Sequence, residues 1–477
     1  MANTIKIGNI EASAVMIGNS AVSAVYIGST KIYPSGGTVD YSKQYLTFEV
    51  VDGGNVTITA SNANVAKTIQ YSTDNGSTWT SLTTSTTAQE LGGTLNVGDK
   101  VLVKGTNTTY GGTNCNSFGG TAKVNVYGNI MSLISGDDFA NNKTLTDAFT
   151  FEKLFYSHTN LLLAENLILP ATTLETNCYN YMFYGCTSLV NAPKLPATTL
   201  AKSCYDSMFK NCTNLKTAPV LPATTLADWC YQNMFYGCTS LVNAPVLPAT
   251  TLTQNCYSSM FQGCTSLTSA PELPATTLTQ NCYYSMFQGC TSLVNAPVLP
   301  ATTLTQNCYY SMFQGCTSLV NAPVLPATTL TDFCYRQMFQ GCTSLVNAPV
   351  LPATTLATRC YGSMFKGCTS LVTAPTLPAM TLANDCYSYM FIGCTNIKTA
   401  PELPAERLER NCYTGMFRDC SSLNYIKAMF TTTPGTIYTK NWVSGVASSG
   451  TFVKNRTASW DVTGVNGIPT GWTVVTE

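Results

Sequence analysis

Twenty cysteines recur at fixed spacing in this chain, and their thiols are the side chains of the repeated region that could do chemistry. The first series runs from Cys178 to Cys412 in steps of 26 residues, and a second series follows it eight residues later, from Cys186 to Cys420. Regularly placed cysteines can bind zinc or iron–sulfur clusters, can close disulfides, or can fill a core as small apolar groups. The spacing and the neighbouring residues decide between these roles.

The eight-residue spacing weighs against the first two roles. Eight residues of a helix rise about 12 Å, whereas the Cα atoms of a disulfide lie within about 7 Å of each other. Zinc and iron–sulfur sites favour closer cysteine pairs, often with histidine, and His158 is the only histidine. We therefore expect no metal and no cofactor, but two ladders of buried thiols, with disulfides between neighbouring repeats as the alternative. Reduced thiols fit folding in a cytoplasm.

The cysteines mark a longer repeat that determines the architecture. Ten units of 26 residues, each close to LPATTLTQNCYYSMFQGCTSLVNAPV, run over residues 169–428, and the units 273–298 and 299–324 are identical. A fixed period of this length indicates a solenoid, in which each coil buries its apolar face against its neighbours.

Within one coil, the apolar pattern predicts a short helix followed by a short strand. Apolar residues from Cys308 to Phe313 stand at i, i+1, i+4 and i+5, and Gly315 could end a helix there. Leu319 to Ala322 could form a short strand, and Pro323 and Pro326 confine the turn after it and block ladder donors. The LPATT run also resembles a cell-wall sorting tag, but it lies inside the chain and lacks the glycine of LPxTG. Leu299 is therefore expected in the core.

Positions that vary between units mark the candidate binding face. The variation concentrates just before the first cysteine, just after its tyrosine and after the phenylalanine, and we expect these positions on one exposed side. Exposed aromatic residues and arginine favour contacts with sugars or proteins, although neutral drift of a solvated surface is the alternative. The candidates are Trp229, Tyr310, Phe333, Arg336, Arg359 and Tyr389.

Residues 1–37 precede the other modules and carry a repeat of their own. The strings IKIGNIEASA, VMIGNSAVSA and VYIGSTKIYP predict short strands and tight turns, which are too few to fold alone. We expect a docking segment that orders on a partner, with Ile7, Ile17 and Ile27 as the candidate contacts.

The remaining segments flank the solenoid, and together they predict a fold that is mostly β with short helices. Strand runs and turns over residues 38–130 indicate a β-sandwich of Ig-like type, in which YSTDNGSTW matches the Asp-box hairpin and forms a structural turn. Residues 131–168 should link and cap the solenoid, with His158 at the place of the second cysteine. Residues 429–477 should form a small C-terminal β cap.

Composition excludes several classes of function. Lys plus Arg equal Asp plus Glu at 24 each, and 10% of the residues are charged, so no basic surface is expected for nucleic acid. No apolar run approaches the roughly 20 residues of a membrane span, and the first residues do not resemble a signal peptide. Acidic residues are scattered, whereas a glycosidase needs two carboxylates across a cleft. We therefore predict no membrane partner and no enzyme.

At MFQGCTSL and its copies, residues 154–428 resemble the BspA-type leucine-rich repeats of bacterial and phage surface proteins. The YSTDNGSTW module, the GNIMSLISGDDFA junction and the IGSTKIYP start are together similar to proteins of gut Bacteroidales and their crAss-like tailed phages. The resemblance implies stacked coils, a surface or virion component and no catalytic residue.

On this basis we expect a non-enzymatic structural protein on the virion surface, namely a head fibre, a capsid decoration or a tail fibre. Residues 1–37 would contact other virion proteins, and the solenoid would attach to a glycan or protein of the host surface. Such fibres are symmetric oligomers, so a homodimer or homotrimer is expected by analogy. A bacterial surface adhesin is the alternative, and a glycan-cleaving enzyme is the third possibility.

Overall fold

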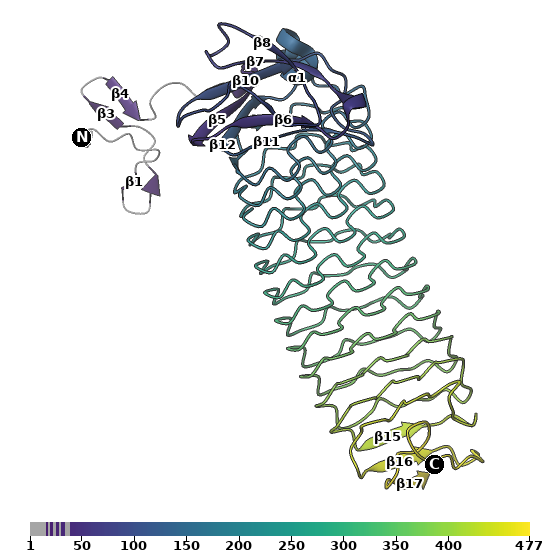
Figure 1. Ribbon diagram of the computed structural model, residues 1–477. Coiled ribbons are helices and arrows are strands. Elements are labelled where there is room, and N and C mark those ends of the chain that lie inside the picture. Colours follow the sequence, from purple (N-terminus) through teal and green to yellow (C-terminus); the bar gives the residue numbers. More distant parts are fainter. Residues whose placement is uncertain (1–15, 18–19, 22–24, 28–29, 34–38) are drawn as a thin grey trace.

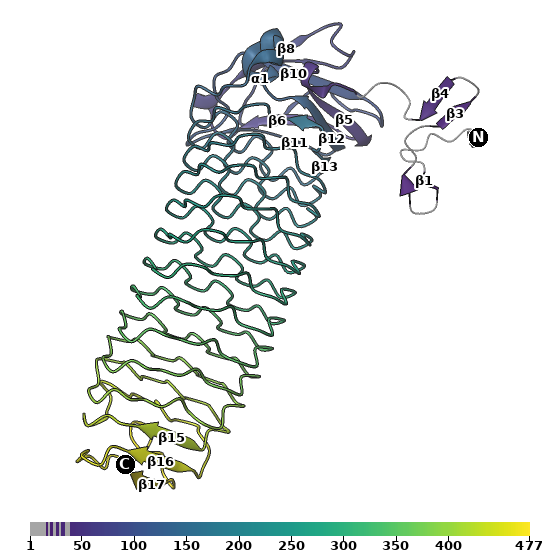
Figure 2. The same ribbon diagram turned by 180° about the vertical axis from the view of Figure 1, so that it is seen from behind.

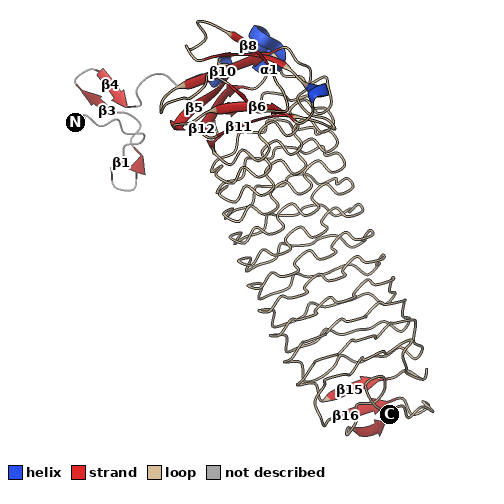
Figure 3. Cartoon of the chain, viewed as in Figure 1, coloured by secondary structure: helices blue, strands red, loops and turns tan. Residues whose placement is uncertain are grey.

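The computed structural model describes residues 39–477 and the short segments 16–17, 20–21, 25–27 and 30–33. Beyond residue 38 the chain forms an elongated rod, with β-sheets at one end, a stack of coils, and a small sheet at the other end (Figure 1). The view from behind shows the same continuous stack (Figure 2). Strands and irregular coils dominate the described residues, which contain one short α-helix (Figure 3).

The strands before the solenoid are β1 (Met16–Ile17), β2 (Ser20–Ala21), β3 (Val25–Ile27), β4 (Thr30–Tyr33), β5 (Leu46–Asp52), β6 (Val56–Ala60), β7 (Thr68–Ser72), β8 (Thr80–Thr83), β9 (Gln89–Glu90), β10 (Lys100–Gly105), β11 (Asn116–Gly120) and β12 (Lys123–Asn129). The later strands are β13 (Leu161–Leu163), β14 (Leu167–Ile168), β15 (Tyr425–Ala428), β16 (Thr451–Lys454) and β17 (Thr473–Thr476). The helices are α1 (Ser132–Ser135) and the 3-10 helices η1 (Tyr41–Lys43), η2 (Ala63–Val65) and η3 (Gly136–Asn141).

The first strands form two antiparallel hairpins, β1 with β2 and β3 with β4. Of the residues proposed for docking, Ile17 ends β1 and Ile27 ends β3, whereas Ile7 lies outside the described residues.

The predicted N-terminal β-sheet region is confirmed. One sheet has the strand order β13-β12-β5-β10-β7-β8, and a second sheet has the order β11-β6-β9. Alternating side chains of β5 and β10 point into the core, and Phe48 of β5 contacts Phe118 of β11 with ring centroids 5.0 Å apart. The two sheets therefore bury their apolar faces against each other.

The first strands of the solenoid extend the N-terminal sheet. β12 pairs in parallel with both β13 and β14, through Val124 opposite Leu161 and Gly128 opposite Leu167. Phe155 stacks between Phe118 of the sheets and Phe183 of the next coil, at 5.9 and 5.1 Å. The sheets thus cover the open end of the coil stack with paired backbone and packed aromatic rings.

The prediction of a helix in each coil is wrong, because this segment is a ribbon of successive turns. The N–H groups alternate: that of Met312 donates to the carbonyl of Tyr309, three residues back, while that of Phe313 donates to Met338 in the next coil, 2.9 Å away. Left-handed residues recur every four positions, at Asn307, Ser311 and Gly315, with φ of 56, 53 and 73°. A right-handed helix excludes positive φ, whereas type II turns require it.

The sequence led to the wrong element because the apolar period is four residues. Over the nine residues from Cys308 to Cys316, a period of four is hard to distinguish from the 3.6 of a helix. Gly315, the predicted helix stop, is the third left-handed residue of the ribbon. Asparagine and glycine at four-residue spacing are the sequence feature that indicates turns here.

The predicted strand from Leu319 to Ala322 is also wrong. Only Asn321 bridges its neighbours in parallel, to Asn295 and Asn347. A second line of bridges joins Thr303 to its equivalents on either side. Proline has no N–H to donate, so the prolines between these two lines prevent a continuous ladder.

The core of the stack consists of columns of identical side chains. Tyr309, Met312, Phe313 and Leu319 are at most 1% exposed, as are their equivalents in the neighbouring coils. Phe313 stacks on the Phe rings before and after it, with centroids 5.7 and 5.8 Å apart. Leu299 is 2% exposed, so its predicted place in the core is confirmed.

The C-terminal segment continues the stack with a small parallel sheet. β15 pairs with β16 and β16 with β17, while Tyr425 of β15 also bridges Thr399 of the preceding coil. Trp442 packs over the last ring of the tyrosine column, with centroids 6.3 Å apart, and its indole N–H donates to Gly467. No helix among the described residues has the length and apolarity of a membrane span.

Candidate binding surface

The twenty cysteines of the repeats are held as buried, protonated thiols. All 21 are free, and the predicted ladders are buried in every coil. The Sγ of Cys316 donates to the carbonyl oxygen of Phe287 in the preceding coil at 3.1 Å, and this contact recurs throughout the second series. Burial raises the pKa of Cys178 to about 12, so these thiols are poor nucleophiles and poor metal ligands.

His158 is buried at the start of the second cysteine column. It is 3% exposed, and its backbone N–H donates to the carbonyl of Phe155, as the backbone N–H of Cys186 donates to the carbonyl of Phe183. Within the described part of the chain, neither ring nitrogen has a hydrogen-bond partner. Burial lowers the pKa of His158 to about 4, so the ring is neutral at physiological pH. The described residues contain no cluster of three or more histidine, cysteine or acidic side chains that could hold a metal.

The Asp-box is a structural turn, as predicted. Asp74 accepts hydrogen bonds from Ser72 Oγ at 2.7 Å and from Thr78 N and Oγ1 at 2.9 and 2.6 Å. These hydrogen bonds hold the pKa of Asp74 down at about 2. Trp79 at the end of the hairpin packs under Lys104 Nζ, 4.2 Å from the ring centroid.

Four of the six predicted binding residues lie together on the outer side of the turn ribbons. Tyr310 and Phe333 each lie 5.7 Å from the Cζ of Arg336, and Phe333 lies 5.6 Å from the Cζ of Arg359. Tyr284 extends the row by stacking on Tyr310 at 5.0 Å. We call these five residues the aromatic–arginine strip. Its members come from four successive coils.

Two positions of the ribbon build the strip. Tyr284, Tyr310 and Arg336 follow the buried tyrosine of their coils, so they form one column with the 26-residue repeat. Phe333 and Arg359 precede the first cysteine and form the adjacent column. Sequence reasoning missed Tyr284, although it occupies the same position as Tyr310 in an identical unit.

Phe333 and Arg359 occupy left-handed positions, with φ of 61 and 55°. The equivalent residue in the three coils directly before Phe333 is asparagine, the non-glycine type that tolerates this conformation best: Asn255, Asn281 and Asn307. A bulky residue costs about 1 kcal/mol or more there. Phe333 is half-exposed and Arg359 is exposed, so neither side chain improves the packing of the core. The presence of two bulky residues at neighbouring left-handed positions needs another explanation.

The other two predicted residues lie apart from the strip. Trp229, two coils before Tyr284, also has a positive φ, and its ring lies 4.6 Å from Lys202 Nζ. Tyr389 is 41% exposed and covers Gly415, where an added Cβ would overlap its ring.

A further aromatic group near the start of the solenoid was not predicted. Tyr156 stacks on Tyr184 at 4.8 Å, and Tyr181 packs between Tyr184 and Lys153. The sequence feature that could have indicated it is the run of tyrosines at the same variable positions.

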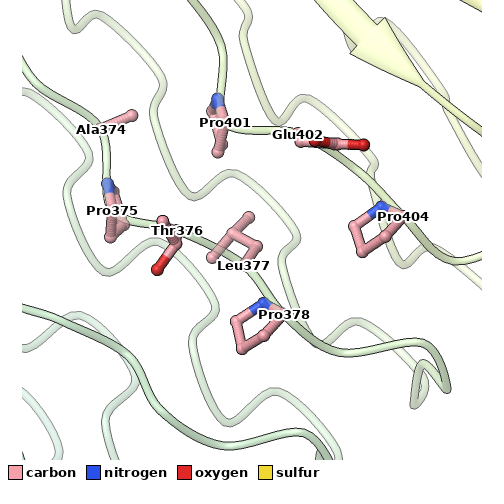
Figure 4. A pocket seen from close by; sticks show the side chains of 8 residues that line it. All are labelled: Ala374, Pro375, Thr376, Leu377, Pro378, Pro401, Glu402 and Pro404. Atoms are coloured by element: carbon pink, nitrogen blue, oxygen red, sulfur yellow. The ribbon is translucent and has the colours of Figure 1, made fainter.

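The proline-rich side of the coils carries shallow grooves. A groove of about 410 Å³ lies between two coils, with proline rings along both walls and Glu402 at its edge (Figure 4). Four coils earlier, an equivalent groove of about 360 Å³ contains Glu272. Each groove has a single carboxylate, and that of Glu402 lies 3.2 Å from Lys427 Nζ. Neither groove presents the opposed carboxylate pair of a glycosidase.

A family model described as the BspA type leucine rich repeat region matches the chain in six copies. The matched segments are 152–294, 229–346, 254–398 and 335–435, which together span more than half of the chain. No curated protein matches it.

Proposed function

We propose that this chain, which belongs to the BspA-type leucine-rich repeat family, is a non-catalytic binding protein that contacts its ligand through the turn ribbons. Repeats of this family are generally binding repeats without catalysis. The solenoid serves as a rigid support, because every second N–H of its turn ribbons is bonded to the next coil and its core columns are buried.

The observation that carries the proposal is the aromatic–arginine strip. Tyrosine and arginine dominate the energetics of protein interfaces, and here they form one contiguous surface. The left-handed backbone of Phe333 and Arg359 costs stability at positions where asparagine fits better. Such strain persists where a site requires the side chain, which supports a binding role over drift.

The residues with catalytic potential are occupied by structural tasks. The second-series thiols donate to backbone carbonyls, the His158 ring is buried without a partner, and Asp74 holds a turn. This distribution supports a binding protein over a hydrolase.

We further propose that the binding protein is a virion component, namely a head fibre, a capsid decoration or a tail fibre. The support is the resemblance to proteins of crAss-like phages, together with buried thiols that suit folding in a reducing cytoplasm. In this role residues 1–37 contact other virion proteins, the Ig-like sandwich of residues 38–130 spaces the solenoid, and the protein is a dimer or trimer on the virion surface. A bacterial surface adhesin of the same family is the second candidate.

The binding role is tested on an array of bacterial and mammalian glycans. A triple variant would carry residues that other coils have at the same positions: Tyr310→Ser, Phe333→Asn and Arg336→Ser. The matched control, Gln254→Ala with Gln262→Ala, alters the turn face of a coil outside the strip. We expect wild type and control to bind the same glycans and the triple variant to lose them. Equal binding by all three proteins would refute the strip as the contact surface.

The virion role needs a separate measurement. Mass spectrometry of purified phage particles and of membranes from uninfected host cells would detect peptides of the chain. Peptides in particles alone support the virion component, and peptides in uninfected membranes support the adhesin.

A further inference from the structure

We propose that the aromatic–arginine strip recognises an acidic polysaccharide, with Arg336 binding the carboxylate of one sugar unit. This inference rests on the proposed function and specifies the ligand class of the same surface.

Arg336 is preorganised and has no acidic partner among the residues that the structure describes. Its guanidinium lies 5.7 Å from the ring centroids of both Tyr310 and Phe333, and the residue is half-buried between them. No carboxylate within the described part of the chain lies within 4.0 Å of it. A guanidinium held in this way presents a fork of N–H donors that matches a carboxylate in two hydrogen bonds.

The neighbouring acidic groups are already engaged. Asp385 lies 3.6 Å from Arg359 Nε, and Asp332 accepts the backbone N–H of Thr358 at 3.0 Å. Arg336 is therefore the cation of the strip that is available for a ligand.

Gly362 lies directly beside Arg336 and is buried by its neighbours. It follows Tyr284, Tyr310 and Arg336 in the same column and precedes Ser388, so it is the position where the column lacks a side chain. An added Cβ would lie 3.7 Å from Arg336 Cγ and 3.4 Å from Ser388 Oγ. Its φ is not in the left-handed region, so the turn itself does not require glycine. A larger side chain at this position would press against Arg336 and displace it from its place between the two rings.

The strip is extended along the stack and suits a polymer. Tyr284 and Tyr310 stack at 5.0 Å with their planes 14° apart, and both rings are half-buried. A row of rings from successive coils offers apolar surface to successive units of a linear chain, while the rings' hydroxyl groups can hydrogen-bond. A polysaccharide with carboxylates can pack its sugar units on the rings and bind Arg336 through a carboxylate. A single small anion would contact Arg336 alone.

The test measures binding of the full chain to three acidic polymers: polygalacturonate, hyaluronate and polysialic acid. Carboxyl-reduced polygalacturonate and poly-glutamate serve as neutral and peptide comparisons. We expect at least one acidic polysaccharide to bind, and Arg336→Gln to weaken it about tenfold or more. Gly362→Asn introduces the residue type that another coil has at the equivalent position, Asn180. It should weaken binding as much as Arg336→Gln does, without changing the net charge. Arg418→Gln removes an exposed arginine three coils beyond Arg336 and is the matched control.

The outcomes separate the ligand class from the proposed function. Failure of all three acidic polysaccharides to bind overturns the inference, as does equal binding of the carboxyl-reduced polymer or preference for poly-glutamate. If the glycan array still shows binding that the triple variant loses, the binding role stands and only the acidic class is wrong. Circular dichroism and melting curves of each variant show whether a loss of binding reflects a loss of fold.

Discussion

The carbonyl oxygen of Phe287 accepts two hydrogen bonds at 3.1 Å, one from the N–H of Cys290 in its own coil and one from the thiol of Cys316 in the next. The first bond closes a turn of the ribbon, and the second ties the coil to its neighbour. The same pair of bonds recurs along the second cysteine column, which explains why a thiol, with its weak donor, occupies this buried position.

The two cysteines of a coil should therefore differ in their contributions to stability. Cys316→Ala removes a buried donor, whereas Cys308→Ala removes a buried side chain that makes no such bond. Both leave a similar cavity, so we expect the free energy of unfolding to fall about 1 kcal/mol further for Cys316→Ala. Urea denaturation of the two variants measures the difference. Equal losses would show that the thiol contributes packing alone.

The thiols should resist modification as long as the fold persists. Cys115 is the half-buried cysteine, and the other twenty are buried. Thiolate is the reactive form, and burial raises the pKa of the stacked thiols. A chromogenic disulfide reagent should titrate about one thiol in native protein and all 21 in guanidinium chloride. Cys115→Ser is the control and should remove the native reaction. Rapid native reaction of several thiols would contradict the buried ladders.

The repeat, the sheet-rich first module and the buried thiols could be predicted from the sequence, because each depends on composition or on spacing along the chain. The turn ribbon could not, since a four-residue apolar period fits both a short helix and a row of turns. The contact of Arg336 with Phe333 lies within one coil, but its contact with Tyr310 joins residues 26 apart. The variable positions predicted the face, and the stacking that defines the strip followed only from the structure.

His158 should make the solenoid sensitive to acid. Its folded pKa of about 4 lies below the unfolded value of about 6.5, so the unfolded chain binds more protons between these values. The stability contributed by the neutral ring is complete above pH 6.5 and decreases as pH falls, by about 3 kcal/mol at pH 4.

The measurement compares wild type with His158→Leu from pH 7.5 to pH 4. Asp206 has the opposite trend, because burial raises its pKa to about 6 and the folded state then retains its proton longer. The difference between the two proteins isolates the histidine. We expect the melting temperature of wild type to fall more steeply with acid than that of His158→Leu. Parallel curves would contradict a neutral, buried ring.

The left-handed residues of the strip should lower stability relative to asparagine. Arg359 is exposed, so Arg359→Asn loses little packing, and its ion pair with Asp385 is worth little at the surface. We expect the substitution to raise the free energy of unfolding by about 1 kcal/mol, because asparagine tolerates a φ of 55° better. Arg336→Asn is the matched control, since Arg336 lies outside the left-handed region and should show no gain. A lower melting temperature for Arg359→Asn would mean that the arginine stabilises the fold. The left-handed backbone at this position would then not support a binding role.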